Sequence, residues 1–236
     1  MKMPPICIPV MGETISVFLS HLRDVMALSD FIELRFDSLR DVTSEKQVKI
    51  LKTILSKITR DTRFIFTCRP RSEGGAYRLG EAERKVLIES FIEMYHAQGF
   101  TNGYIDIESS SLAKWSFELS DMPLIVSYHN YSKTPSTHEM IKLVVEMKKY
   151  HPRIVKIATM VNSEEDCHNL YRLQLSNLKV PMLVIGMGEK GKVTRVVSPL
   201  LGSPWVYASS QYGASAPGQY QFDEIRRIFS LIVTNC

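Results

Sequence analysis

The chain has 236 residues, of which 44% are hydrophobic and 23% charged, the profile of an ordinary globular domain. This composition excludes a disordered, collagenous or membrane-spanning chain. The 29 basic and 25 acidic residues give a net charge of +4 without a run of five like charges, so neither nucleic acid nor a membrane surface is expected as a partner.

The four cysteines are widely separated and form no CxxC pair. The first nine residues contain no continuous apolar stretch of the kind that a secretory signal requires. We therefore expect reduced thiols and a cytoplasmic protein. The six histidines form no HExxH or HxH pattern, so no metal site is expected.

Short runs rich in β-branched and aromatic residues alternate along the chain with longer stretches of helical period. The predicted strands cover residues 6–10, 31–36, 64–69, 103–108, 124–129, 154–160, 182–188 and 205–210. Apolar stripes such as Val48, Leu51, Leu55 and Ile58 predict helices between them. The segments 43–45 and 163–165 are typical of helix starts, because a capping hydroxyl precedes an acidic residue.

Eight strands in 236 residues leave about 30 residues for each strand and its helix, which predicts a (β/α)8 TIM barrel in a single domain over residues 1–236. A doubly wound open sheet is the alternative. It usually carries a glycine-rich turn after the first strand, and the sequence PVMGE at 9–13 is no such turn. Residues 209–218, rich in Gly, Ser and Ala, follow the last strand, where a mobile lid would lie.

Polar and apolar side chains alternate along several predicted strands. In the second strand Ile32 and Leu34 alternate with Glu33 and Arg35. Later strands place further polar groups on one face, namely Thr67, Arg69, Asp106, Glu108, Ser127, His129 and Lys156. A half-solvated antiparallel sheet shows the same alternation, but the long helical intervals favour a barrel with these groups inside.

Lys156 lies among residues that bury well, so its ammonium should be partly desolvated. Arg35, Arg69 and Arg195 could converge on the same pocket and would favour the neutral amine further. Such an amine attacks a carbonyl to form a Schiff base. A lysine that protects an edge strand from aggregation would give the same local pattern.

His129 ends the strand before that of Lys156, and histidine titrates in the range that a general base needs. Glu73 follows Arg69 by four residues, and its loop could bring the carboxylate to the imidazole. Alternatively, His129 is a structural histidine, and the segment that carries Glu73 is a charged loop without a role in catalysis.

The segment 186–192, with sequence GMGEKGK, follows the seventh strand, where barrels often bind phosphate. The competing interpretation is that this segment carries Arg195 into the site, where its guanidinium would bind a substrate carboxylate.

Taken together, these motifs resemble the type I 3-dehydroquinate dehydratases, the Schiff-base-forming enzymes of the shikimate pathway. The resemblance runs from about Ile6 to Ile232. It rests on ELRFD at 33–37, TCR at 67–69, EGG at 73–75, SYH at 127–129, VKIA at 155–158, MG at 187–188 with Arg195, and SAPGQ at 215–219. The family implies loss of water from 3-dehydroquinate in aromatic amino acid biosynthesis, no metal or organic cofactor, and a homodimer.

The resemblance also implies roles for individual residues. Lys156 would form the imine, His129 would move the proton, Glu73 would orient His129, and Arg195 would hold the substrate carboxylate. The remaining substrate contacts would come from Glu33, Arg35, Arg69, Met187, Tyr207, Ser215 and Gln219. Leu34, Ile185 and Tyr207 depart from the common pattern, and the stretch before Ser215 looks one residue longer, which affects pocket shape and the lid.

Two other functions fit the same residues. A Schiff-base aldolase or transaldolase would use Lys156 but needs a phosphate site, for which only 186–192 is available. A non-catalytic barrel could bind a small acid through Arg195, Arg35 and Arg69, and would bind it equally well without the lysine.

Overall fold

A computed structural model describes residues 2–115 and 122–233. The strands are β1 (Ile6–Val10), β2 (Phe31–Arg35), β3 (Arg63–Thr67), β4 (Gly103–Glu108), β5 (Leu124–Asn130), β6 (Ile154–Met160), β7 (Met182–Met187), β8 (Val206–Ser209) and β9 (Tyr220–Gln221). The helices are α1 (Ile15–Met26), α2 (Gln47–Leu55), α3 (Glu81–Ala97), α4 (Ser109–Leu112), α5 (Thr137–Met147), α6 (Glu164–Leu175), α7 (Thr194–Leu200) and α8 (Phe222–Val233). All eight predicted strands are present, with ends that differ by no more than two residues.

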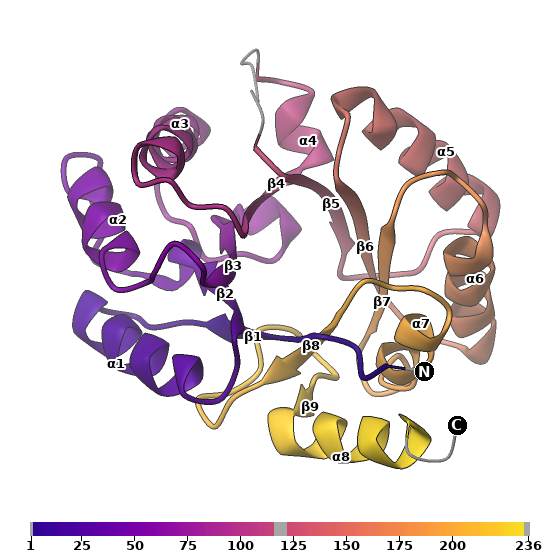
Figure 1. Cartoon of the computed structure of the whole chain (residues 1–236). Helices are drawn as coiled ribbons and strands as arrows, with labels where there is room; N and C mark the ends of the chain where they lie inside the picture. The colour runs from indigo at the N-terminus through magenta and orange to yellow at the C-terminus, as the bar shows by residue number, and fades with distance from the viewer. Residues whose placement is uncertain (1, 116–121, 234–236) are drawn as a thin grey trace.

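The strands form a parallel ladder in the order β7-β6-β5-β4-β3-β2-β1-β8-β9. Each strand from β2 to β7 pairs with its predecessor, whereas a doubly wound sheet changes direction about its middle. Figure 1 shows the strands curled into a ring with the helices outside it, and α7 contacts both β7 and β8 at the seam. The predicted (β/α)8 barrel is confirmed.

The alternation along the strands is confirmed as well. The apolar positions, such as Leu34, Phe66 and Val155, belong to a large core that packs against the helices, and Phe66 stacks on Phe91 of α3 with ring centroids 4.2 Å apart. A second cluster that includes Ile65 is made by inward-facing residues of several strands. Each such side chain contributes about 1.5–3 kcal/mol when it is fully buried.

One of the two expected helix starts is correct. Ser163 caps α6 through a capping box with Asp166. The start expected at 43–45 is wrong, because α2 begins at Gln47. Gln47 fixes that end by tertiary contacts: its side-chain amide donates to the carbonyl of Glu83, and its Oε1 accepts from the Tyr77 hydroxyl.

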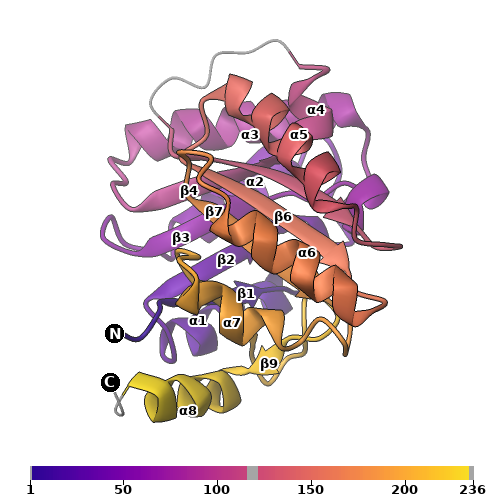
Figure 2. The ribbon, with the colours of Figure 1, turned by 90° about the vertical axis from the view of Figure 1, so that its right-hand side faces the viewer.

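The short strand β9 was not expected from the sequence. It pairs with β8 and returns the chain to the barrel after the loop 210–219, so this loop is held at both ends. In the side view of Figure 2, α6 and α7 cover the barrel wall, and the N-terminus lies at the left.

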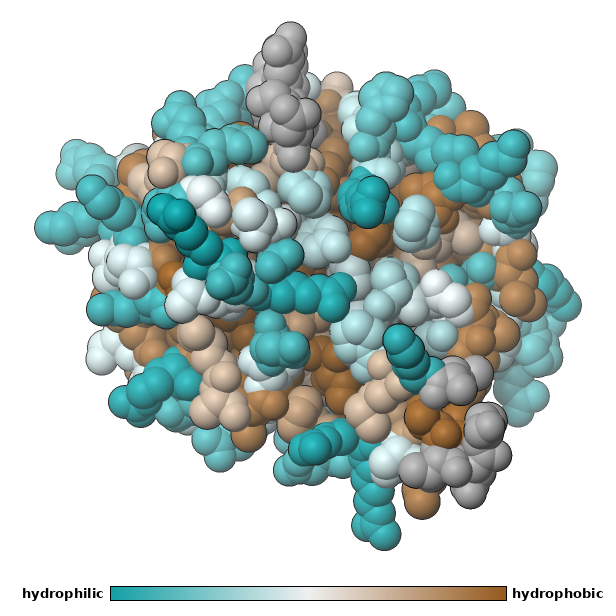
Figure 3. All heavy atoms as spheres, in the orientation of Figure 1, coloured by the Kyte–Doolittle hydropathy of each residue, from teal (hydrophilic) through white to brown (hydrophobic). Residues whose placement is uncertain are grey.

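The surface is largely polar. In Figure 3 hydrophilic side chains predominate around the rim of the molecule. Among the described residues, no helix has the length and apolarity needed to cross a bilayer. Cys7, Cys68 and Cys167 are buried free thiols, while Cys236 lies outside the described residues.

Candidate active site

A cavity of about 40 Å³ lies at the carboxyl ends of the strands. It is lined by ten of the eleven residues that the sequence singled out; the eleventh, Glu73, contacts His129. A wider groove of about 640 Å³ lies at the other end of the barrel, and Arg63, Tyr104 and Arg153 form part of it. That groove contains none of the predicted residues, so the smaller cavity is the candidate site.

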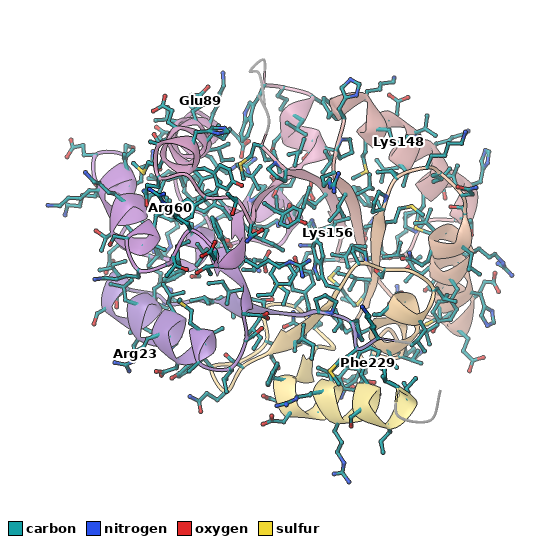
Figure 4. The ribbon with its side chains drawn as sticks, in the orientation of Figure 1. Arg23, Arg60, Glu89, Lys148, Lys156 and Phe229 are labelled. Carbon is teal, nitrogen blue, oxygen red and sulfur yellow. The ribbon has the colours of Figure 1, made fainter. Side chains whose placement is uncertain are left out.

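Lys156 lies inside the ring of strands, as Figure 4 shows, and only 6% of it is exposed. Its strand β6 pairs with β5 on one side and β7 on the other, so the interpretation as an edge-strand lysine is wrong. Nζ donates to Asp106 Oδ2 at 2.9 Å, and Glu33 Oε1 lies 3.8 Å away.

The charges around Lys156 differ from the expected group of cations. The nearest charged groups to Nζ are carboxylates, because Asp106 reaches it from β4 and Glu33 from β2. Arg35 does not act as a free cation, since its Nε and one terminal nitrogen both donate to Asp37. The buried amine therefore lies in a paired environment rather than a purely cationic one.

Tyr207 of β8 lies beside the same amine. Its hydroxyl is 3.4 Å from Lys156 Nζ, and its ring centroid is 4.8 Å from that nitrogen. Burial, reinforced by Glu33, raises the pKa of the Tyr207 hydroxyl well above its usual range. The group is therefore a neutral phenol that can donate or accept a hydrogen bond.

His129 and Glu73 form the predicted pair. Glu73 Oε2 lies 3.1 Å from His129 Nδ1 and also accepts the backbone N–H of His129 at 3.0 Å, while Ser110 Oγ donates to Oε1 at 2.7 Å. This arrangement favours a proton on Nδ1 and leaves Nε2 as the basic nitrogen. Burial, with added repulsion from Arg69 and Lys156, lowers the pKa of His129 well below its ordinary value.

Arg195 extends from α7 into the same cavity and is 3% exposed. One terminal nitrogen donates to the Pro217 carbonyl at 3.0 Å, whereas Nε has no hydrogen-bond partner among the described residues. Burial lowers the pKa of Arg195 to about 10. A buried guanidinium in this condition is suited to receive a carboxylate from a ligand.

Arg69 is fixed from several directions. Its two terminal nitrogens donate to Asp106, Glu108 and Ser127. Glu108 in turn pairs with Arg84, a fully buried arginine of α3. This network holds the polar floor of the cavity rigid.

The loop 210–219 covers the cavity as a lid. Ser215 N–H donates to Gln219 Oε1, and Gln219 Nε2 donates to Ser215 Oγ. The backbone at Gly218 has a φ of +76° and lies so close to the Gly188 carbonyl that a Cβ would be 2.4 Å from that oxygen. The expected lid position is confirmed, and glycine is required for its close approach to the barrel.

Several backbone amides of the segment 186–192 are already paired inside the protein. The N–H of Gly188 donates to Pro217, that of Gly191 to Gly188, and that of Lys192 to Glu189. The bond from Gly188 to Pro217 attaches this segment to the loop 210–219. The segment also leads directly to α7, which carries Arg195. Of the two interpretations of this segment, the pairing favours the one in which it carries Arg195 into the site over the phosphate cradle.

Sequence reasoning missed two residues of the site. The sequence places Asp106 on the polar face of its strand but does not indicate its contact with Lys156. Tyr131 follows β5 and lines the cavity next to His129. Within residues 2–115 and 122–233, no group of three or more His, Cys, Asp or Glu side chains could hold a metal ion.

Comparison with known proteins agrees with the geometry. The family described as Type I 3-dehydroquinase matches residues 6–235. A 3-dehydroquinate dehydratase of Coxiella burnetii (strain CbuK_Q154) is 34% identical over 96% of this chain and 92% of its own, and one of Methanococcus maripaludis (strain C6 / ATCC BAA-1332) is 35% identical over 96% and 99%.

The solved structure of 3-dehydroquinate dehydratase from Geobacillus kaustophilus HTA426 superposes with a TM-score of 0.84 and 28% identity, covering 98% of this chain and 91% of that one. The family match therefore extends over nearly the whole described barrel, including every strand that carries a site residue. This chain belongs to the type I 3-dehydroquinase family.

Proposed function

We propose that the enzyme eliminates water from 3-dehydroquinate to give 3-dehydroshikimate, through a Schiff base on Lys156. The observation that carries the proposal is that one cavity brings together a buried amine, a Glu-oriented imidazole and a buried arginine without a carboxylate partner among the described residues. A small ring that carries a ketone, an acidic C–H and a carboxylate would engage all three, because the amine would react with the ketone, the imidazole would take the proton and the arginine would bind the carboxylate.

The chemistry begins at the ketone. The neutral amine of Lys156 adds to C3, and loss of water from the adduct gives an iminium ion. Its positive charge draws electrons from the neighbouring carbon, so the C2 proton becomes acidic. His129 takes this proton at Nε2, since its lowered pKa keeps the ring neutral near pH 7.

The resulting enamine expels the C1 hydroxyl, and the imidazolium of His129 protonates the leaving oxygen to form water. Hydrolysis of the product imine then regenerates Lys156. Over one cycle, the substrate loses one water and the enzyme is unchanged. No step calls for a redox change.

Substrate binding is assigned to the rest of the cavity. Arg195 would pair with the C1 carboxylate, and Glu33, Arg35 and Arg69 would contact ring hydroxyls. Met187 and Tyr207 would shape the wall, while Ser215 and Gln219 would close from the lid. Because Ser215 and Gln219 of the loop 210–219 line a cavity of only about 40 Å³, the proposal includes movement of this lid when the substrate enters.

The decisive test combines turnover with trapping. Purified enzyme is given 3-dehydroquinate, and the enone absorbance of the product is followed; borohydride is then added and the reduced adduct is located by mass spectrometry. We expect turnover and an adduct on Lys156, absent in Lys156→Ala. An adduct on Lys190 or Lys192, or cleavage of a sugar phosphate in place of dehydration, would refute the assignment.

We further propose that this activity serves the shikimate pathway in the cytoplasm, in a single catalytic domain that works as a homodimer, as in the family it resembles. Light scattering coupled to size exclusion would give the mass. A mass of one 236-residue chain at assay concentration would refute the dimer.

A further inference from the structure

Asp106 is the side chain most tightly held against the reactive nitrogen. It projects from β4, its side chain is fully buried, and its Oδ2 accepts from Lys156 Nζ at 2.9 Å. The same oxygen accepts from Arg69 at 2.8 Å, and Oδ1 accepts from Ser127 Oγ at 2.6 Å. Three donors, from β5, from β6 and from the segment that follows β3, therefore fix this carboxylate in place.

The charge of Asp106 is permanent. Arg69 and Lys156 hold its pKa far below the usual range, despite the opposing effect of burial. Such a carboxylate does not take a proton from the amine at any ordinary assay pH. Its influence on Lys156 is consequently electrostatic.

The other polar groups around the amine are less directly engaged. The polar side chains that line the same cavity are those of Glu33, Arg35, Arg69, His129, Tyr131, Arg195, Tyr207, Ser215 and Gln219. Glu33 is 3.8 Å from Nζ, and its Oε1 already accepts from Thr67 at 2.7 Å. Asp106 is thus the closest anion to the nitrogen.

We propose that Asp106 is a catalytic residue, the counter-ion that stays bonded to Nζ while the ammonium is converted to the iminium. This inference rests on the proposed Schiff-base function. The overall condensation joins R–NH₃⁺ and a ketone to give a protonated imine and water, so the charge on nitrogen is +1 before and after. One N–H remains on the iminium, and Asp106 Oδ2 is placed to accept it.

The ion pair has two effects on the reaction. It keeps the imine protonated, which is the form that acidifies the neighbouring carbon. It also points the single N–H toward β4, so the C=N bond extends into the cavity beside His129 and Arg195. The proton that leaves the ammonium before attack returns when the adduct loses its hydroxyl as water, and His129 can carry it.

The first test measures the free enzyme. Lys156 is labelled competitively with acetic anhydride across a pH series, and the modified fraction is read by mass spectrometry. Asp106→Asn should shift the midpoint of Lys156 labelling to lower pH by at least one unit, because the anion that holds the ammonium is gone. Glu108→Gln is the matched control, since it removes a buried anion from Arg69 without touching Nζ; we expect less than a third of that shift.

The second test uses unaltered enzyme, so it does not depend on the variant folding. The imine formed with excess 3-dehydroshikimate is examined by Raman spectroscopy near pH 7. A C=N stretch that moves on transfer to D₂O shows a protonated imine and supports the proposal; a stretch that does not move overturns it.

The outcomes separate the two proposals. If borohydride and substrate give no adduct on Lys156 in the unaltered enzyme, the proposed function fails. If the adduct forms but folded Asp106→Asn labels with the midpoint of the unaltered enzyme, only the counter-ion role fails.

Discussion

Replacing Glu73 by Gln tests what the carboxylate contributes to His129. Glu73 Oε2 accepts two N–H groups of His129, and Oε1 accepts the Ser110 hydroxyl. In Glu73→Gln the amide oxygen can take the Oε2 position, while the amide NH₂ donates to Ser110 after its hydroxyl rotates. All three hydrogen bonds survive, and only the charge is lost.

The expected cost follows from that difference. A hydrogen bond to a charged group contributes about 1.5–3 kcal/mol, against about 0.5–1.5 kcal/mol for a neutral one. The loss is thus about 1–1.5 kcal/mol, or roughly five- to thirteenfold in kcat. Glu73→Ala removes the acceptor as well, so His129 would lose its orientation. We expect kcat to fall by roughly 10²-fold or more, because general acid–base catalysis by a positioned side chain contributes about 10²–10⁴-fold.

The assay is steady-state absorbance of the enone over a pH series. Loss of the negative charge lowers the pKa of His129 further, so the acidic limb of kcat/KM in Glu73→Gln should move to lower pH. Glu165→Gln on α6, which removes an exposed glutamate beside His168, is the control and should change neither value. If Glu73→Gln lost as much activity as His129→Ala, Glu73 would have to act in proton transfer rather than orientation.

Three further results are expected. Arg195→Ala should weaken substrate binding, and so raise KM, by a factor that corresponds to roughly 2–5 kcal/mol, the cost of truncating a buried charge pair. Arg195→Lys should recover only part of this loss, and an unchanged KM would remove Arg195 from carboxylate binding. Because the lowered pKa of His129 keeps its base form populated, kcat/KM of the unaltered enzyme should stay on its plateau below pH 6.5, and a limb at or above 6.5 would contradict this. Arg84→Ala should lower the free energy of unfolding in urea by about 3–5 kcal/mol, whereas Arg172→Ala in an exposed pair should cost under about 1 kcal/mol.

The barrel could be predicted from sequence because its signals are local. Strand residues such as Ile32 and Leu34 alternate with polar neighbours over five or six positions, and long helical stretches intervene. Where a tertiary contact decides, the prediction was wrong. The start of α2 depends on Gln47 reaching Tyr77 and Glu83, which lie 30 and 36 residues away.

The partner of the reactive amine could not be predicted for a similar reason. Alternation placed Asp106 and Lys156 on the same inner face, but the contact depends on strand register. Asp106 is aligned with Ile125, and Lys156 with Ser127, two residues further along β5. Only this offset brings the carboxylate under the amine. The Glu73–His129 pair could be predicted because the motifs at 73–75 and 127–129 resemble those of a family in which this glutamate orients this histidine.

The pairing of the buried arginines distinguishes Arg195 from the others, which bears on the proposed substrate binding. Buried ion pairs are costly to assemble, and each of Arg35, Arg69 and Arg84 has carboxylate partners that offset this cost. Among the residues that the structure describes, Arg195 is buried with only a carbonyl partner, the one given by Pro217. A substrate carboxylate would supply the missing anion, while the imine keeps the positive charge of Lys156 beside Asp106. The proposed substrate would thus give the buried Arg195 the anionic partner that the described residues do not supply, and this pairing would favour closure of the lid after the substrate has entered.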